Sequence, residues 1–242
     1  MDCVKRFWDV AEVRPAEDGA GWQVMLDGKP VRIPGGAPVL LPTRALADAV
    51  AGEWRAAGGA KGGDFDLQAM PLTRLAGTAQ ERVDPAREAI ALELARYGES
   101  DLLCYRTELP VGLAQRQAAA WQVWLDWAAA THGARLTSTT TLQHQTQDPA
   151  ALAALAAEVA RHDSYELAAL GVLVPALGSL VLGLAVSAAA ISAEEAHALS
   201  VLDETYQEEM WGRDADAHAG RLRVAADVTA AARFLALARA VA

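Results

Sequence analysis

The sequence has few cationic side chains. Its 242 residues include 21 Lys and Arg against 31 Asp and Glu, which gives a formal net charge of −10. A nucleic-acid interface needs basic side chains that neutralise phosphates, and a surface held on anionic lipid needs the same charge. The composition therefore argues against both kinds of partner and is compatible with a basic protein surface as partner.

Cysteine is also scarce. Cys3 and Cys104 are the two cysteines, which is too few for a disulfide framework or a paired-cysteine metal site. The first residues lack the apolar core of a signal peptide and the Arg- and Ser-rich pattern of a mitochondrial presequence. We therefore expect a cytoplasmic protein.

One long stretch lacks charge altogether. Residues 171–191 contain no charged side chain over about the length that a bilayer requires. However, Pro175 and Gly178 interrupt the stretch, and neither an aromatic belt nor a basic flank accompanies it. The pattern favours a buried helix pair with a break near these residues over membrane insertion.

The first hundred residues alternate short strand signals with turns. Residues 22–26 are rich in strand formers, Asp27-Gly28 is a strong hairpin signal, and residues 29–34 return after it. Residues 7–13 are a further strand candidate. Thr43 has the position of an N-cap for a helix with apolar residues at helical spacing, which we expect to end at the glycine-rich loop that follows.

Helical patterns dominate the remainder. Ser192 and Glu195 have the spacing of a capping box, which predicts a helix that runs to about Trp211. Residues 102–106 fit a strand or a linker. The other predicted helices cover residues 73–83, 85–97, 113–132, 149–161, 165–174, 177–190 and 216–242. The sequence thus predicts an α+β fold, with a small antiparallel sheet-plus-helix domain over residues 1–100 and an all-α domain over residues 101–242.

Catalytic motifs are largely missing. The glycine-rich loop at residues 58–63 holds Lys61 without a following Ser or Thr, so it is not a phosphate-binding loop. Glu194 and His197 form one Glu-x-x-His unit, which di-iron bundles use in pairs, and His162 stands at the wrong spacing from Glu158 to supply a second. An enzyme that depends on a metal or small molecule, with Glu194, His197 and His162 in the helical bundle, is the alternative hypothesis.

Acidic residues gather late in the chain. Glu204 and Glu208 share one helix face, which fits either a solvated face or an acidic patch for a basic partner. Trp211-Gly212 follows directly and fits either a helix C-cap or an aromatic interface anchor.

Eight short motifs in a fixed order resemble a known family. They are Val31-x-x-Pro34, Leu41-Pro42-Thr43, Ala49-Val50-Ala51-x-Glu53-Trp54, Met70-Pro71-Leu72-Thr73, Asp101-Leu102-Leu103-Cys104-Tyr105-Arg106, Gly178-Ser179-Leu180-Val181-Leu182, Leu199-Ser200-x-Leu202-Asp203-Glu204-x-Tyr206-Gln207 and Trp211-Gly212. Together they resemble the ATP-twelve family, assembly chaperones for the F1 sector of ATP synthase found in mitochondria and some bacteria.

The resemblance implies a non-enzymatic chaperone without a cofactor or metal. It implies binding to the unassembled F1-ATPase alpha subunit, in the bacterial cytoplasm or, for eukaryotic relatives, the mitochondrial matrix. We expect a monomer that touches its partner through the acidic region around Trp-Gly, with Glu53 and Trp54 as structural support at the domain junction. The expected contact residues are Trp211, Gly212, Asp214, Asp216, Glu204 and Glu208.

Overall fold

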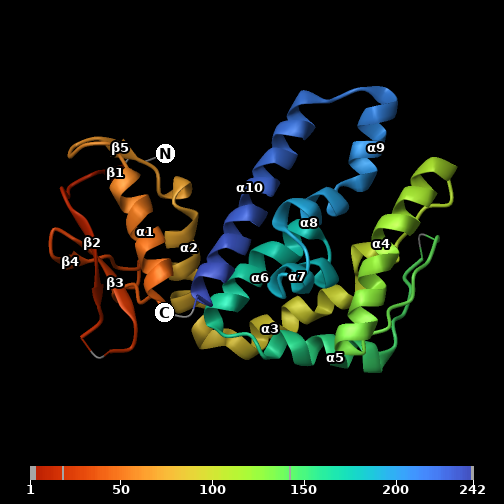
Figure 1. Ribbon diagram of the computed structural model, residues 1–242, viewed down its shortest axis with the longest axis horizontal. Helices are drawn as coiled ribbons and strands as arrows, with labels where there is room; N and C mark the ends of the chain where they lie inside the picture. Colours follow the sequence, from red (N-terminus) through yellow and green to blue (C-terminus); the bar gives the residue numbers. More distant parts are fainter. Residues whose placement is uncertain (1–3, 18, 142, 241–242) are drawn as a thin grey trace. The chain divides into compact units, whose positions relative to one another are not determined.

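The computed structural model describes residues 4–17, 19–141 and 143–240, so Cys3 lies outside the described residues. Short strands occupy the first part of the chain and helices the rest (Figure 1). This arrangement confirms the predicted α+β class with a helical C-terminal region.

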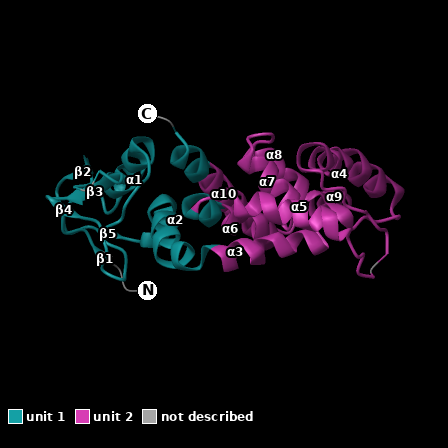
Figure 2. Cartoon of the chain, turned by 90° about the horizontal axis from the view of Figure 1, so that it is seen from below, with its two compact units in different colours: residues 1–87, 164–169, 233–242 teal, residues 88–163, 170–232 magenta. Residues whose placement is uncertain are grey.

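The chain forms two compact units that are not continuous in sequence (Figure 2). Each unit combines segments that lie far apart along the chain. The predicted domain division after residue 100 stays a prediction, because a compact unit need not fold alone. Residues 1–87, 164–169 and 233–242 make up unit 1, and residues 88–163 and 170–232 make up unit 2.

Unit 1 contains a three-stranded antiparallel sheet of β2 (Ala11–Pro15), β3 (Trp22–Leu26) and β4 (Lys29–Pro30). Asp27 and Gly28 connect β3 to β4 with φ of 46° and 80°. Positive φ at both central residues is what a tight hairpin turn with the right twist requires. The predicted hairpin is therefore confirmed.

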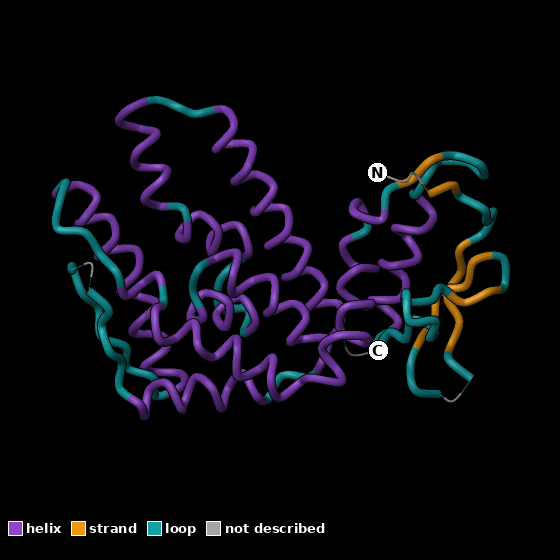
Figure 3. Tube along the Cα trace, turned by 180° about the vertical axis from the view of Figure 1, so that it is seen from behind, coloured by secondary structure: helices purple, strands orange, loops and turns teal. Residues whose placement is uncertain are grey.

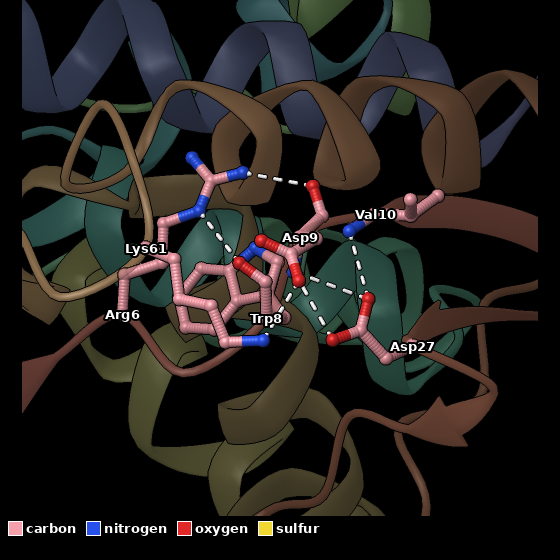
Figure 4. Close-up of polar contacts among 6 residues, drawn as sticks. All are labelled: Arg6, Trp8, Asp9, Val10, Asp27 and Lys61. Carbon is pink, nitrogen blue, oxygen red and sulfur yellow. Dashed lines mark hydrogen bonds and ion pairs between the residues drawn. The ribbon is translucent and has the colours of Figure 1, made fainter.

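The first predicted strand is displaced. The sequence favoured residues 7–13, whereas β1 covers Val4–Lys5, pairs with β5 (Asp64–Phe65), and β2 begins only at Ala11. The reason is that a side chain, in place of a neighbouring strand, accepts the backbone hydrogen bonds of the residues just before β2. The Asp27 carboxylate accepts hydrogen bonds from the backbone N–H groups of Asp9 and Val10 (Figure 4). These bonds lower the pKa of the exposed Asp27 carboxyl below its ordinary value.

Arg6 fastens this segment to the end of α1 (Arg44–Ala56). The side chain is 7% exposed, and its guanidinium donates to the carbonyl oxygens of Trp8 and Asp9 (Figure 4). It also donates to the carbonyl oxygens of Arg55, Ala57 and Gly59 at 2.8–3.0 Å. A cation at a helix C-terminus satisfies carbonyl groups that lack a partner within the helix.

The local signals for α1 are confirmed. The Thr43 hydroxyl accepts the hydrogen bond of the Leu46 N–H, as an N-cap does. The buried face of α1 ends at Trp54, whose ring lies edge-to-face with Trp8 and Phe65. After η1 (Leu67–Ala69), a helical path continues through α2 (Pro71–Thr78), η2 (Ala79–Val83), η3 (Asp84–Ala86), α3 (Arg87–Ala95) and η4 (Arg96–Ser100).

Residues 102–106 do not form a strand. Leu102–Cys104 is instead the short 3-10 helix η5, because the buried Asp101 carboxylate accepts the Leu103 N–H and starts a turn. The same carboxylate accepts the Ser179 hydroxyl at 2.8 Å and the Val181 N–H at 3.0 Å. Asp101 therefore connects η5 to the start of α7 (Leu180–Ser187).

The charge-free stretch forms the core of unit 2. It contains the last part of α6 (Ser164–Leu177) and the wholly buried α7, with the break at Gly178. A Cβ at Gly183 would lie 2.6 Å from Cγ2 of Val174, so this glycine allows the two helices to approach closely. Within the described residues, no helix combines the length and the apolarity that crossing a bilayer requires.

The helix predicted from Ser192 to Trp211 is interrupted once. The capping box of Ser192 and Glu195 is present with both hydrogen bonds. At Val201, however, φ of −110° and ψ of 25° depart from the helix and separate α8 (Ala193–Ser200) from α9 (Leu202–Trp211). The remaining helices of the bundle are α4 (Val111–His132), α5 (Pro149–Ala160) and α10 (Ala215–Ala238).

Candidate functional site

The end of α9 carries two apolar side chains into solvent. Trp211, the last residue of α9, is 79% exposed, and its neighbour Met210 is 61% exposed. Gly212 follows with φ of 92°, and its N–H donates to the carbonyl of Glu208, so the helix stops there. Large exposed apolar side chains of this kind mark protein contact sites. The sequence analysis singled out Trp211 but missed Met210. The signal that could have found Met210 is its place beside Trp211, directly before the glycine that ends the helix.

The acidic face of α9 is partly neutralised by arginines. The Glu208 carboxylate forms an ion pair with Arg221 of α10, and both side chains are largely buried. Glu209 pairs with Arg116 of α4 at 2.7 Å. Glu204 is exposed. The two carboxylates predicted to share one face therefore differ, since Glu208 helps to hold α10 while Glu204 faces solvent.

Asp214 and Asp216 stand at the start of α10. Asp214 precedes the helix, and its Oδ1 accepts the Ala217 N–H at 2.9 Å, which is an N-cap hydrogen bond. Asp216 is exposed in the first turn, where the helix dipole favours a negative charge. Asp214 thus has a structural role in addition to its charge.

A groove of about 750 Å³ runs along unit 2 beside α9 and α10. His197 lies close to it, and burial, followed by the charge of Arg221, lowers the pKa of its imidazole below the ordinary value. The groove combines an apolar lining with charged groups. Its lining includes Leu102, Val201, Val224, Glu204, Arg221 and Asp227.

The first half of α4 contacts α9 and the helix before it. Gln117 of α4 donates to Asp203 of α9 at 2.7 Å, and the indole N–H of Trp121 donates to the carbonyl of Leu199 in α8 at 3.0 Å. The guanidinium of Arg116 lies over the ring of Tyr206, 5.0 Å from its centroid. These contacts position the end of α9 and its exposed side chains.

The two residues expected to give structural support have contacts inside unit 1. The Glu53 carboxylate accepts the N–H groups of Leu72 and Thr73 at 2.8 Å and the Thr73 hydroxyl at 2.6 Å. It thereby satisfies the start of α2. Trp54 is 7% exposed and packs against Trp8.

The alternative metal site finds little support in the geometry. His162 is engaged by the Ser187 hydroxyl at 2.8 Å and by the Glu158 carbonyl at 3.0 Å, whereas Glu194 is exposed. His197 keeps one buried ring nitrogen without a hydrogen-bond partner. Across residues 4–17, 19–141 and 143–240, no three His, Cys, Asp or Glu side chains come together in a way that could hold a metal ion.

The fold and this exposed surface define a protein that can act by binding another protein. Comparison with known proteins is more specific. The family model described as ATP12 chaperone protein matches residues 5–129, more than half of the chain. The chain therefore belongs to the ATP12 chaperone family.

Solved structures agree with this assignment. The chain is 44% identical to Atp12 from Paracoccus denitrificans, with a TM-score of 0.91 over 97% of this chain and 98% of that one. A variant of the same P. denitrificans protein with an aspartate replaced by lysine matches equally well. A candidate chaperone from Agrobacterium tumefaciens is 35% identical, with a TM-score of 0.88 over 96% of this chain and 85% of that one.

Proposed function

We propose that this chain is a non-enzymatic assembly chaperone that binds the unassembled alpha subunit of F1-ATPase. Bound in this way, it prevents aggregation of the subunit and promotes assembly of the F1 sector. Membership of the ATP12 chaperone family supports the chaperone role. The observation that carries the binding mode is the exposed pair Met210 and Trp211 at the end of α9.

The proposed chaperone role needs no catalytic group. A subunit that waits for its neighbours exposes surface that later becomes an interface, and such surface aggregates when it stays uncovered. A protein that binds the free subunit lowers the concentration of the aggregating species by mass action. The chaperone then needs shape, apolar area and charge. We place it in the bacterial cytoplasm as a monomer without cofactor.

The proposed contact residues are those at the α9–α10 connection. Trp211 supplies apolar area, while Gly212, Asp214 and Asp216 shape and charge the connection. Glu204 contributes from the exposed face of α9. Glu208 is included through its ion pair with Arg221, which holds α10 beside α9.

The test is co-expression of the tagged chain with the alpha or the beta subunit of the same organism, followed by affinity capture without added ATP. We expect capture of alpha and not of beta. Capture of neither subunit contradicts the proposal. Light scattering of the purified chain then checks the expected monomer.

Variants refine the test. Trp211→Ala with Asp216→Lys is expected to weaken capture of alpha and to leave thermal unfolding nearly unchanged, since both side chains are exposed. Asp214→Asn removes the charge and retains a residue that caps helices well, so it separates charge from stability. Glu93→Lys, an exposed acid on α3, is the matched control and is expected to bind alpha normally.

A further inference from the structure

Two helix ends in unit 2 carry exposed apolar side chains. Leu109, just before α4, is 73% exposed, and Val111, its first residue, is 58% exposed. Met210 and Trp211 are exposed at the end of α9. Figures 1 and 3 show the start of α4 and the end of α9 at the same end of the helix pair.

The contacts of α4 fix this register. Near the middle of α4, Trp121 reaches Leu199 in α8, which precedes α9 in the chain. Nearer its start, Gln117 reaches Asp203. Five residues before Gln117, a Cβ at Gly112 would lie 3.0 Å from the hydroxyl of Tyr206. Residues earlier in α4 therefore contact residues later in α9, so the two helices are antiparallel. Leu109 and Val111 thus lie at the same end of the helix pair as Met210 and Trp211.

We infer that Leu109, Val111, Met210 and Trp211 form one docking ridge, and that it binds an apolar segment of the F1 alpha subunit flanked by Lys or Arg. This inference rests on the proposed function and extends its surface to the start of α4. Leu109 and Val111 supply area that no acidic or aromatic motif in the sequence indicates.

Charge decides which occupant fits the ridge. Residues 203–216 contain six carboxylates and one arginine, and Glu108 adds a carboxylate beside Leu109. Arg116 and Arg221 neutralise two of these acids, Glu209 and Glu208, so the surroundings stay negative. A second copy of this chain on a two-fold axis would bring acid against acid. A partner with basic residues around an apolar patch meets complementary charge.

The test uses the full chain with Leu109→Ser and Val111→Ser together. Co-expressed alpha subunit is expected to be captured roughly tenfold less, because apolar contact area is lost from the proposed ridge. Leu109→Met with Val111→Ile keeps the apolar area and is expected to restore capture. Circular dichroism during heating checks that each variant is folded.

Leu92→Ser with Val123→Ser is the matched control, since these side chains are 65% and 60% exposed elsewhere in unit 2. It is expected to capture alpha as the unchanged chain does. Equal capture by the folded Leu109/Val111 serine variant overturns the ridge while the proposed function stands. Absence of capture by the unchanged chain overturns both. A dimer of the unchanged chain that becomes monomeric in the serine variant assigns the ridge to a second copy and overturns the inference.

Discussion

Gln117 and Asp203 hold α4 and α9 together through one buried amide. The Gln117 side chain is 1% exposed, and its Nε2 donates to Oδ1 of Asp203 at 2.7 Å. Its Oε1 accepts the backbone N–H of Thr107 at 2.7 Å. The side chain thus uses both ends of its amide, one on α9 and one on the segment that leads into α4. The position of the proposed ridge depends on this bond because it sets how the two helices lie.

Replacement of Gln117 by Leu is expected to destabilise the chain. The substitution leaves the Thr107 N–H and the Asp203 carboxylate without their partner, at a cost of about 1–3 kcal/mol in the free energy of unfolding. Urea unfolding followed by circular dichroism measures the change. Gln115→Leu, on the exposed side of the same helix, is the control and is expected to change stability by about 0.5 kcal/mol or less. Equal stability of the two variants contradicts the role of the bond.

Glu53 predicts a second stability effect, in unit 1. Glu53→Ala removes the acceptor of three hydrogen bonds at the start of α2 and is expected to cost about 1–3 kcal/mol. Glu53→Gln keeps one acceptor oxygen and is expected to cost less. Asp48→Ala removes only an exposed ion pair with Arg44 on the same helix, so a change near zero is expected. A loss for Asp48→Ala as large as that for Glu53→Ala would show that the hydrogen bonds are unimportant.

Asp101 predicts a dependence of stability on pH. Burial of this side chain is the largest influence and raises the pKa of its carboxyl above 3.8, although the hydrogen bonds that it accepts oppose the shift. Between its ordinary pKa and the raised pKa of the folded state, the folded chain binds more protons than the unfolded chain. The contribution of Asp101 to the free energy of unfolding therefore falls as pH rises through this window.

Asp101→Asn carries no such titration and isolates the effect. We expect the stability of the unchanged chain relative to this variant to decrease from about pH 4 to about pH 7. Urea unfolding of both proteins at the two pH values measures it. A relative stability that increases with pH would mean that the hydrogen bonds from Leu103, Ser179 and Val181 outweigh burial.

Local signals predicted the elements whose bonds close within a few residues. The Thr43 cap and the capping box of Ser192 and Glu195 depend on partners three residues away, and the turn at Asp27-Gly28 joins the paired residues Leu26 and Lys29. Their residue types therefore select the backbone conformation directly. The displaced β2 could not be predicted in this way, because it depends on the Asp27 carboxylate, which accepts the N–H groups of Asp9 and Val10. The turn at Leu102–Cys104 starts on a local bond to Asp101, but the contacts of that carboxylate with Ser179 and Val181 are distant in sequence.

The features of the candidate site also separate into those that depend on neighbouring residues and those that depend on distant ones. The sequence by itself determined the family through ordered motifs, the acidic character of residues 203–216, and the Trp211-Gly212 helix end. The tertiary structure alone decided that Glu208 is paired with Arg221 and that Leu109 and Val111 lie at the same end of the helix pair as Trp211. The reason is physical. Helix ends follow from neighbouring residues, whereas ion pairs and surfaces follow from the packing of helices that are distant in sequence.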